Sequence, residues 1–136
     1  MTIINNKILK DFKSWHKGHN VARDQQKHEV MKALLFKHGD NPIPEYKLPG
    51  YDKIGKEGIV DYKENNLIIE IDSRRNEAAL RRLAYARDVL RMSVLWIVIL
   101  PVGEDGERVF DRALYHHIPL LRIFARWNCF YYKYSQ

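Results

Sequence analysis

The chain has 136 residues, of which 46% are hydrophobic and 29% are charged. This length and composition fit a single globular domain and exclude a disordered or collagen-like chain. Lys and Arg outnumber Asp and Glu by 23 to 17, and the net charge of +6 favours a polyanionic partner such as nucleic acid.

Membrane and secreted classes do not fit the sequence. Its longest apolar run, residues 94–102, contains Pro101 and is far shorter than the roughly 20 residues of a membrane span. The first twenty residues lack the continuous apolar segment of a secretory signal. The single cysteine, Cys129, cannot form an intramolecular disulfide, and we expect it to be a small buried residue. We therefore expect a cytoplasmic protein that makes no membrane contact.

The predicted elements begin with residues 1–20, a polar segment expected to form a short helix or an arm. A helix is predicted over residues 21–38, because apolar side chains recur there at helical spacing up to His38-Gly39-Asp40. The prolines of Asn41-Pro-Ile-Pro stop this helix, and a short strand is expected at residues 46–48. A loop over residues 51–56 follows the Pro49-Gly50 turn.

A β-hairpin is predicted next. Its strands are residues 59–63 and 67–71, and the Asn65-Asn66 pair between them suits the positive φ angles of a tight turn. A turn centred on these two residues pairs Tyr62 with Ile69 and Asp61 with Glu70.

The remaining elements alternate between helices and strands. They are a helix at residues 76–91, a strand at 93–100, a helix around 109–116 and an extended segment at 120–127. Because a strand, a helix and a second strand form a right-handed crossover, the strands at 67–71 and 93–100 are expected to be parallel. The chain is thus one domain, 1–136, with a terminal arm (1–20), a central motif region (21–100) and a C-terminal extension (101–136).

Three carboxylates converge in this register. Asp61 and Glu70 lie opposite each other with Cβ atoms about 5 Å apart, and alternation places Asp72 on the same face while Ile69 and Ile71 face the core. Such carboxylates repel each other unless a cation neutralises them. Mg²⁺ or Mn²⁺ is the simplest remedy, because both prefer oxygen ligands. Structural ion pairs with an arginine are the alternative, and the candidates are Arg74, Arg75 and Arg81.

The pattern resembles a known family. The order of elements is similar to the core of the PD-(D/E)xK, or restriction-endonuclease-like, superfamily. That core has an acid on one strand, an acid near the end of the next apolar strand, then a helix and a further apolar strand. Asp61, Leu67-Ile-Ile-Glu-Ile-Asp-Ser73, a basic helix and Ser93-Val-Leu-Trp-Ile-Val resemble its very short patch repair endonuclease branch. The resemblance covers about residues 21–100.

This resemblance implies an α/β fold with a central mixed β-sheet flanked by helices. It also implies a metal-dependent nuclease that hydrolyses phosphodiester bonds, with DNA expected as the substrate in preference to RNA. It makes Asp61 and Glu70 acidic ligands of Mg²⁺ or Mn²⁺ and the backbone carbonyl of Ile71 a third ligand. Glu29, on the preceding helix, would approach the metal through water. The chain departs from the family at Asp72, where the family has a lysine.

The missing lysine matters, because it would orient the attacking water and stabilise phosphate charge. The candidates for a relocated cation are Arg82, Arg81 and Lys63, although guanidinium is a poor general base. A catalytically inactive nucleic-acid-binding protein on the same fold is therefore an alternative function. A domain that binds protein, with its acids paired to arginines, is a third. Another phasing, that is, another way to align the sequence with the family motif, takes Asp52 as the first acid and Asp61-Tyr62-Lys63 as the (D/E)xK triplet.

Basic and aromatic residues lie outside this site. Four arginines are candidates for contacts with nucleic-acid phosphates, namely Arg74, Arg75, Arg81 and Arg87. The aromatic residues between Phe124 and Tyr134 are expected either to form an edge strand that packs onto the core or to form the interface of a homodimer.

Overall fold

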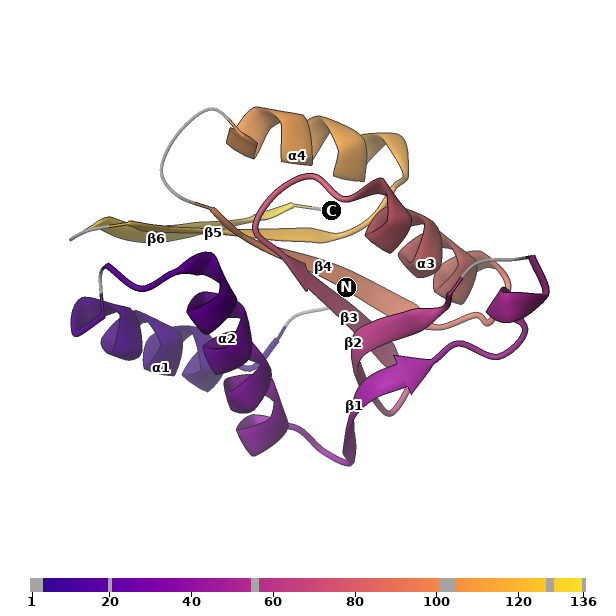
Figure 1. The fold of residues 1–136 in the computed structure, drawn as a ribbon, viewed down its shortest axis with the longest axis horizontal. Coiled ribbons are helices and arrows are strands. Elements are labelled where there is room, and N and C mark those ends of the chain that lie inside the picture. The colour runs from indigo at the N-terminus through magenta and orange to yellow at the C-terminus, as the bar shows by residue number, and fades with distance from the viewer. Residues whose placement is uncertain (1–3, 20, 55–56, 101–104, 127–128, 136) are drawn as a thin grey trace.

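The computed structural model describes residues 4–19, 21–54, 57–100, 105–126 and 129–135. Over these ranges the chain forms one six-stranded mixed sheet, with α1 and α2 against one face and α3 and α4 against the other (Figure 1). The predicted α/β class with a mixed sheet flanked by helices is confirmed. The ends of the predicted segments at Lys56 and Trp127 lie outside the described residues, as does Pro101.

The strands follow their sequence order across the sheet. They are β1 (Pro42–Lys47), β2 (Ile59–Glu64), β3 (Leu67–Asp72), β4 (Ser93–Leu100), β5 (Leu120–Arg126) and β6 (Cys129–Ser135). β1, β2 and β3 form an antiparallel meander, β3, β4 and β5 are parallel, and β6 returns antiparallel to β5. The carboxyl ends of β3, β4 and β5 therefore lie at one end of the sheet.

The helices are close to their predicted positions. They are α1 (Asn6–Lys17), α2 (Asp24–His38), α3 (Glu77–Asp88) and α4 (Asp105–Tyr115), with a 3₁₀ turn, η1, at Tyr51–Ile54. α3 begins where the sequence predicts because the Asn76 side chain accepts a hydrogen bond from the Ala79 N–H. None of these helices, as far as the described residues extend, has the length and apolar character needed to cross a membrane.

The hairpin register is confirmed where the strands pair. Tyr62 lies opposite Ile69 and Glu64 opposite Leu67, and Asn65 adopts the positive φ of 50° that the turn requires. The parallel pairing of β3 with β4 is also confirmed.

The outer strand β1 differs from the prediction, whereas the expected aromatic edge strand is present as β6. β1 begins at Pro42 rather than at residue 46, because an edge strand tolerates prolines whose missing N–H groups would face away from the sheet. The final extended segment is followed by a further strand, β6, which forms the other edge. Cys129 is exposed rather than buried, since it is the first residue of that edge strand.

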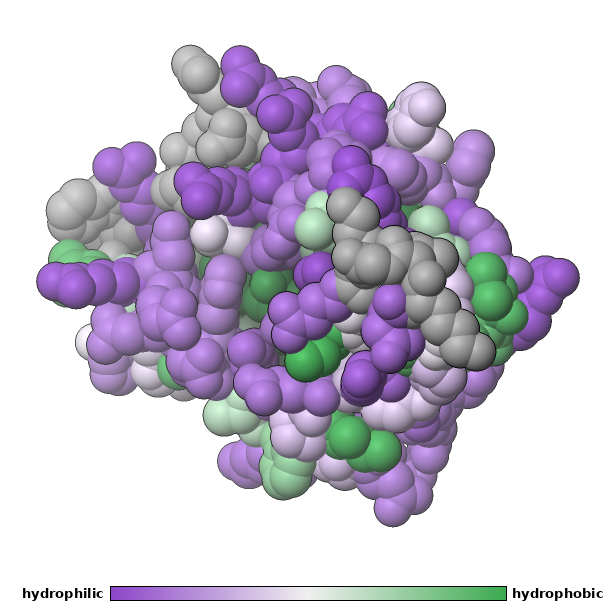
Figure 2. All heavy atoms as spheres, turned by 45° about the vertical axis from the view of Figure 1, so that its right-hand side comes forward, coloured by the Kyte–Doolittle hydropathy of each residue, from purple (hydrophilic) through white to green (hydrophobic). Residues whose placement is uncertain are grey.

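The hydrophobic core lies on both faces of the sheet. Trp96, Val98 and Leu83 belong to the cluster under α3 and α4, whereas Ile97 and Phe12 belong to the cluster under α1 and α2. Figure 2 shows an outer face that is mostly hydrophilic, with hydrophobic side chains in separate spots. The apolar residues of β4 are thus used on both sides, as its continuous apolar sequence predicts.

Candidate active site

Asp61 and Glu70 meet at the point where regular pairing of β2 with β3 ends. Beyond the pair Tyr62 and Ile69, Oδ2 of Asp61 accepts a hydrogen bond from the Ile71 N–H at 2.7 Å. The Asp61 N–H in turn donates to Oε1 of Glu70 at 3.3 Å. Both carboxyl groups are therefore bound into the junction between the two strands, near the carboxyl end of β3.

Glu70 is the buried member of this pair. Only 2% of the residue is exposed, and its Oε2 accepts a hydrogen bond from Nε of Arg82 at 2.6 Å. Burial raises the pKa of Glu70 to about 8, with Arg82 opposing the rise and Asp61 and Asp72 adding to it. A carboxyl group perturbed in this way by burial and by neighbouring charges marks a candidate functional position.

Arg82, a candidate for the relocated cation, reaches the acids, whereas the arginines predicted as structural ion-pair partners, Arg74, Arg75 and Arg81, form no ion pair with the acids in the described residues. Arg82 lies on α3, and its side chain is 19% exposed. Arg81, the next residue on the helix, is exposed. The helix periodicity explains the difference, because adjacent residues point about 100° apart and only one of them faces the sheet.

A second cation, Lys32, comes from α2 and was not predicted from the sequence. Its Nζ lies 3.5 Å from Oδ1 of Asp61 and 3.8 Å from Oε1 of Glu29. Glu29 also accepts a hydrogen bond from Gln25 at 3.3 Å. Lys32 thus lies within ion-pair distance of both Glu29 and Asp61, and the approach of Glu29 to a metal through water stays a prediction. The spacing of Glu29 and Lys32, three residues apart on one helix face, was the signal available in the sequence.

Asp72 links three elements. Its Oδ1 accepts a hydrogen bond from the Asn76 side chain at 2.9 Å, and its Oδ2 accepts one from the indole N–H of Trp96 at 2.8 Å. Burial raises the pKa of Asp72, while these two hydrogen bonds and the nearby imidazole of His28 oppose the rise. With both oxygens occupied, Asp72 joins the end of β3 to the cap of α3 and to β4.

Two predicted candidates are held elsewhere. Nζ of Lys63 lies 5.2 Å from the centre of the Tyr46 ring on β1. Asp52, in η1, is exposed and lies 3.6 Å from Lys47. The phasing that begins with Asp52 places the motif triplet on β2. In the family pattern a helix follows this strand, but β2 leads directly into the hairpin strand β3.

The other predicted phosphate contacts fall into two groups. Arg74 and Arg75 are exposed just beyond the carboxyl end of β3. Arg87 instead donates hydrogen bonds to the carbonyl oxygens of His116 and His117, at 2.7 and 2.8 Å, and pairs with Asp88. It thereby ties the end of α3 to the chain after α4.

The donor set fits a hard divalent cation. Asp61 and Glu70 offer carboxylate oxygens, and Ile71 adds a backbone carbonyl in the same stretch of β3. Across the described ranges, no group of three or more His, Cys, Asp or Glu side chains is arranged to hold a metal ion. Two carboxylates suffice for Mg²⁺, which usually keeps several waters and takes further ligands from substrate phosphates.

Comparison with known proteins yields no match. No family model, no curated protein and no solved structure matches the chain.

Proposed function

We propose that the chain is a metal-dependent nuclease that hydrolyses phosphodiester bonds in nucleic acid, with DNA as the preferred substrate. The observation that carries this proposal is the junction of Asp61 and Glu70 near the carboxyl end of β3. The succession of α2, three antiparallel strands, α3 and parallel β4 supports it, because it follows the restriction-endonuclease-like core that the sequence resembles.

Asp61 and Glu70, with the carbonyl of Ile71, would hold Mg²⁺ or Mn²⁺. When bound, the cation supplies Lewis-acid catalysis at the phosphodiester. Arg82 holds the Glu70 carboxylate in position through the Nε hydrogen bond. Asp72 is assigned a supporting role, since its two oxygens are used in fixing Asn76 and Trp96.

Lys32 takes the place of the missing motif lysine in this proposal. It is an ammonium group next to the first acid, and its side chain is 31% exposed, so a bound phosphate has access to it. An ammonium group is also a better proton donor or acceptor than a guanidinium group. The cation is thus delivered by α2 from one side of the sheet, while Arg82 approaches from α3.

The test is a cleavage assay on plasmid and single-stranded DNA with Mg²⁺, Mn²⁺ or EDTA. Asp61→Asn and Glu70→Gln keep a hydrogen-bond acceptor but cannot supply an ionised oxygen ligand to the cation, so each should lower the rate about 10²-fold or more with little change in thermal stability. The matched control is Asp52→Asn, which removes an exposed acid. If Asp52→Asn abolishes cleavage and Glu70→Gln does not, the Asp52 phasing is right and the Glu70 site is wrong.

One observation favours a second candidate, a nucleic-acid-binding protein without turnover. The Arg82 guanidinium lies 2.6 Å from Glu70, so a cation of the protein itself already balances this acid. This candidate predicts no cleavage with any divalent cation but a salt-dependent affinity for DNA. Cleavage with Mg²⁺ or Mn²⁺ therefore separates the two functions, because both candidates predict binding in EDTA.

A second copy of the chain is a further proposed partner. Tyr131 and Tyr132 on the edge strand β6 are 41% and 49% exposed. Phe130, in contrast, packs onto the core beneath α1. Tyr131 and Tyr132 are consecutive on β6 and point to opposite faces, and Tyr131 stacks on Phe124. The proposed homodimer therefore rests on the edge strand β6, with Tyr132 exposed, and not on the whole aromatic tail.

A further inference from the structure

A pocket of about 180 Å³ lies beside the candidate active site, and three arginines line it. They are Arg74 and Arg75, which follow β3, and Arg108 in the first turns of α4, joined by Val109. Since a water molecule takes about 30 Å³ in the liquid, the pocket has room for about six waters. That is enough for one hydrated phosphate group.

Three of the described acids near this pocket have partners of their own. Glu77, two residues after Arg75, is paired with Arg112, and Asp72 is bound by Asn76 and Trp96. Glu107, the neighbour of Arg108, lies 4.0 Å from Arg122. In the described part of the chain, none of the three pocket arginines forms an ion pair.

Three guanidinium groups that meet in one pocket repel one another, and a bound anion lowers this repulsion. Guanidinium groups also match the oxygens of phosphate through paired N–H donors. The position adds to the attraction. The pocket lies between the start of α3 and the start of α4, where the helix dipoles present partial positive charge.

We infer that this pocket binds a phosphate group of the nucleic-acid strand whose phosphodiester is cut at Asp61 and Glu70. The inference rests on the proposed function and adds a second point at which the protein contacts the nucleic-acid strand. Arg74 and Arg75 lie two and three residues beyond Asp72, so the pocket and the acids share the carboxyl end of the parallel strands. A strand held at both points is fixed in register relative to the acids.

Fluorescence anisotropy in EDTA tests the pocket without cleavage. The probe is a short single-stranded oligonucleotide labelled at its 3′ end, with or without a 5′-phosphate. Arg108→Ala and Arg75→Ala should each weaken binding about tenfold and lower the slope of log affinity against log salt by about 0.7. Loss confined to the phosphorylated probe means that the pocket takes a terminal phosphate, and equal loss with both probes means that it takes an internal one.

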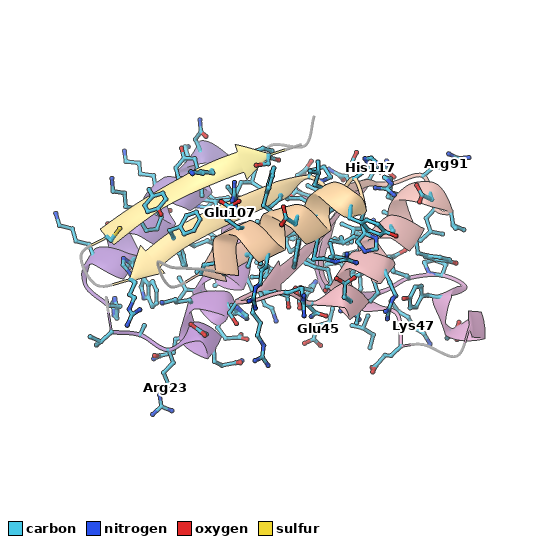
Figure 3. The ribbon with its side chains drawn as sticks, turned by 90° about the horizontal axis from the view of Figure 1, so that it is seen from above. Arg23, Glu45, Lys47, Arg91, Glu107 and His117 are labelled. Carbon is cyan, nitrogen blue, oxygen red and sulfur yellow. The ribbon has the colours of Figure 1, made fainter. Side chains whose placement is uncertain are left out.

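Arg91→Asn is the matched control. Arg91 has a positive φ of 58°, which asparagine tolerates, and it points into solvent at the end of α3, away from Glu107 in α4 (Figure 3). If Arg91→Asn weakens binding as much as Arg108→Ala, only net charge is at work and the pocket is refuted. Failure of the nuclease proposal looks different, because the wild type would then bind through the pocket and cut nothing with Mg²⁺ or Mn²⁺.

Discussion

Glu77 joins α3 to α4, and its replacement by glutamine tests how much this link stabilises the fold. Arg112 donates to both Glu77 oxygens, and Nε2 of His116 lies 3.1 Å from Oε2. Hydrogen bonding by Arg112 lowers the pKa of Glu77 from 4.5 to about 2, against a smaller opposing effect of burial. The ionised carboxylate is therefore favoured in the folded state.

The magnitude follows from that pKa. A drop from 4.5 to about 2, transmitted in full, corresponds to about 3.4 kcal/mol of stability at neutral pH. The Glu77 side chain is 30% exposed and that of Arg112 is 34% exposed, so solvent screening reduces the contribution to about 1–2 kcal/mol. We expect Glu77→Gln to lower the free energy of unfolding by this amount at pH 7.

Urea unfolding of the wild type and Glu77→Gln at several pH values measures the effect. Because the folded pKa is the lower one, the stabilisation is complete above pH 4.5 and is lost as the pH falls toward 2. The difference between the two proteins should shrink to about two fifths of its neutral value near pH 3. Glu107→Gln, at an 82% exposed side chain, is the control and should change little. An unchanged unfolding energy in Glu77→Gln at pH 7, or a difference that persists at low pH, would refute the reasoning.

Three further predictions concern the site and the sheet edge. Lys32→Ala should lower the saturated cleavage rate about 10²-fold while changing DNA affinity much less. The control Lys37→Ala, on the same helix, should change neither quantity. Equal losses in rate and affinity would make Lys32 a simple phosphate contact. Trp96→Phe should lower the free energy of unfolding in urea by about 2 kcal/mol, because it leaves a buried Asp72 oxygen without its hydrogen-bond donor. If Trp15→Phe lowers the free energy of unfolding by as much, this role of Trp96 is contradicted. Sedimentation equilibrium at micromolar concentration should show a dimer that Tyr132→Ser weakens, and a monomer at all concentrations would exclude the proposed assembly.

The hairpin and its acids follow from local sequence. The turn at Asn65 fixes the register from Glu64 and Leu67 to Tyr62 and Ile69, so Asp61 and Glu70 could be predicted as neighbours, although they are joined by side-chain hydrogen bonds and not by regular strand pairing. α3 was similarly determined by its apolar spacing and by Asn76 as its cap. These features depend on neighbours within a few residues.

The cations around the acids depend on how helices dock, which local sequence does not encode. Lys32 reaches Asp61, 29 positions later in the sequence, because α2 packs against the sheet. Arg82 rather than Arg81 meets Glu70 because of the rotation of α3 about its axis. Arg108 reaches Arg74 and Arg75 only when α4 lies beside α3. The acids were thus predictable as a pair, whereas their partners required the tertiary structure.

The two edges of the sheet have opposite capacities for adding a strand. β1 carries Pro42 and Pro44, and Glu45 between Pro44 and Tyr46 adopts a positive φ of 52°, so another strand cannot form a regular ladder along it. β6 has seven residues and contains no proline. Growth by strand addition is therefore possible from β6 alone, and once two copies join there, each presents only its blocked edge. The prolines and the positive φ in β1 therefore also protect the protein from forming fibres, because association through sheet edges would stop at two molecules.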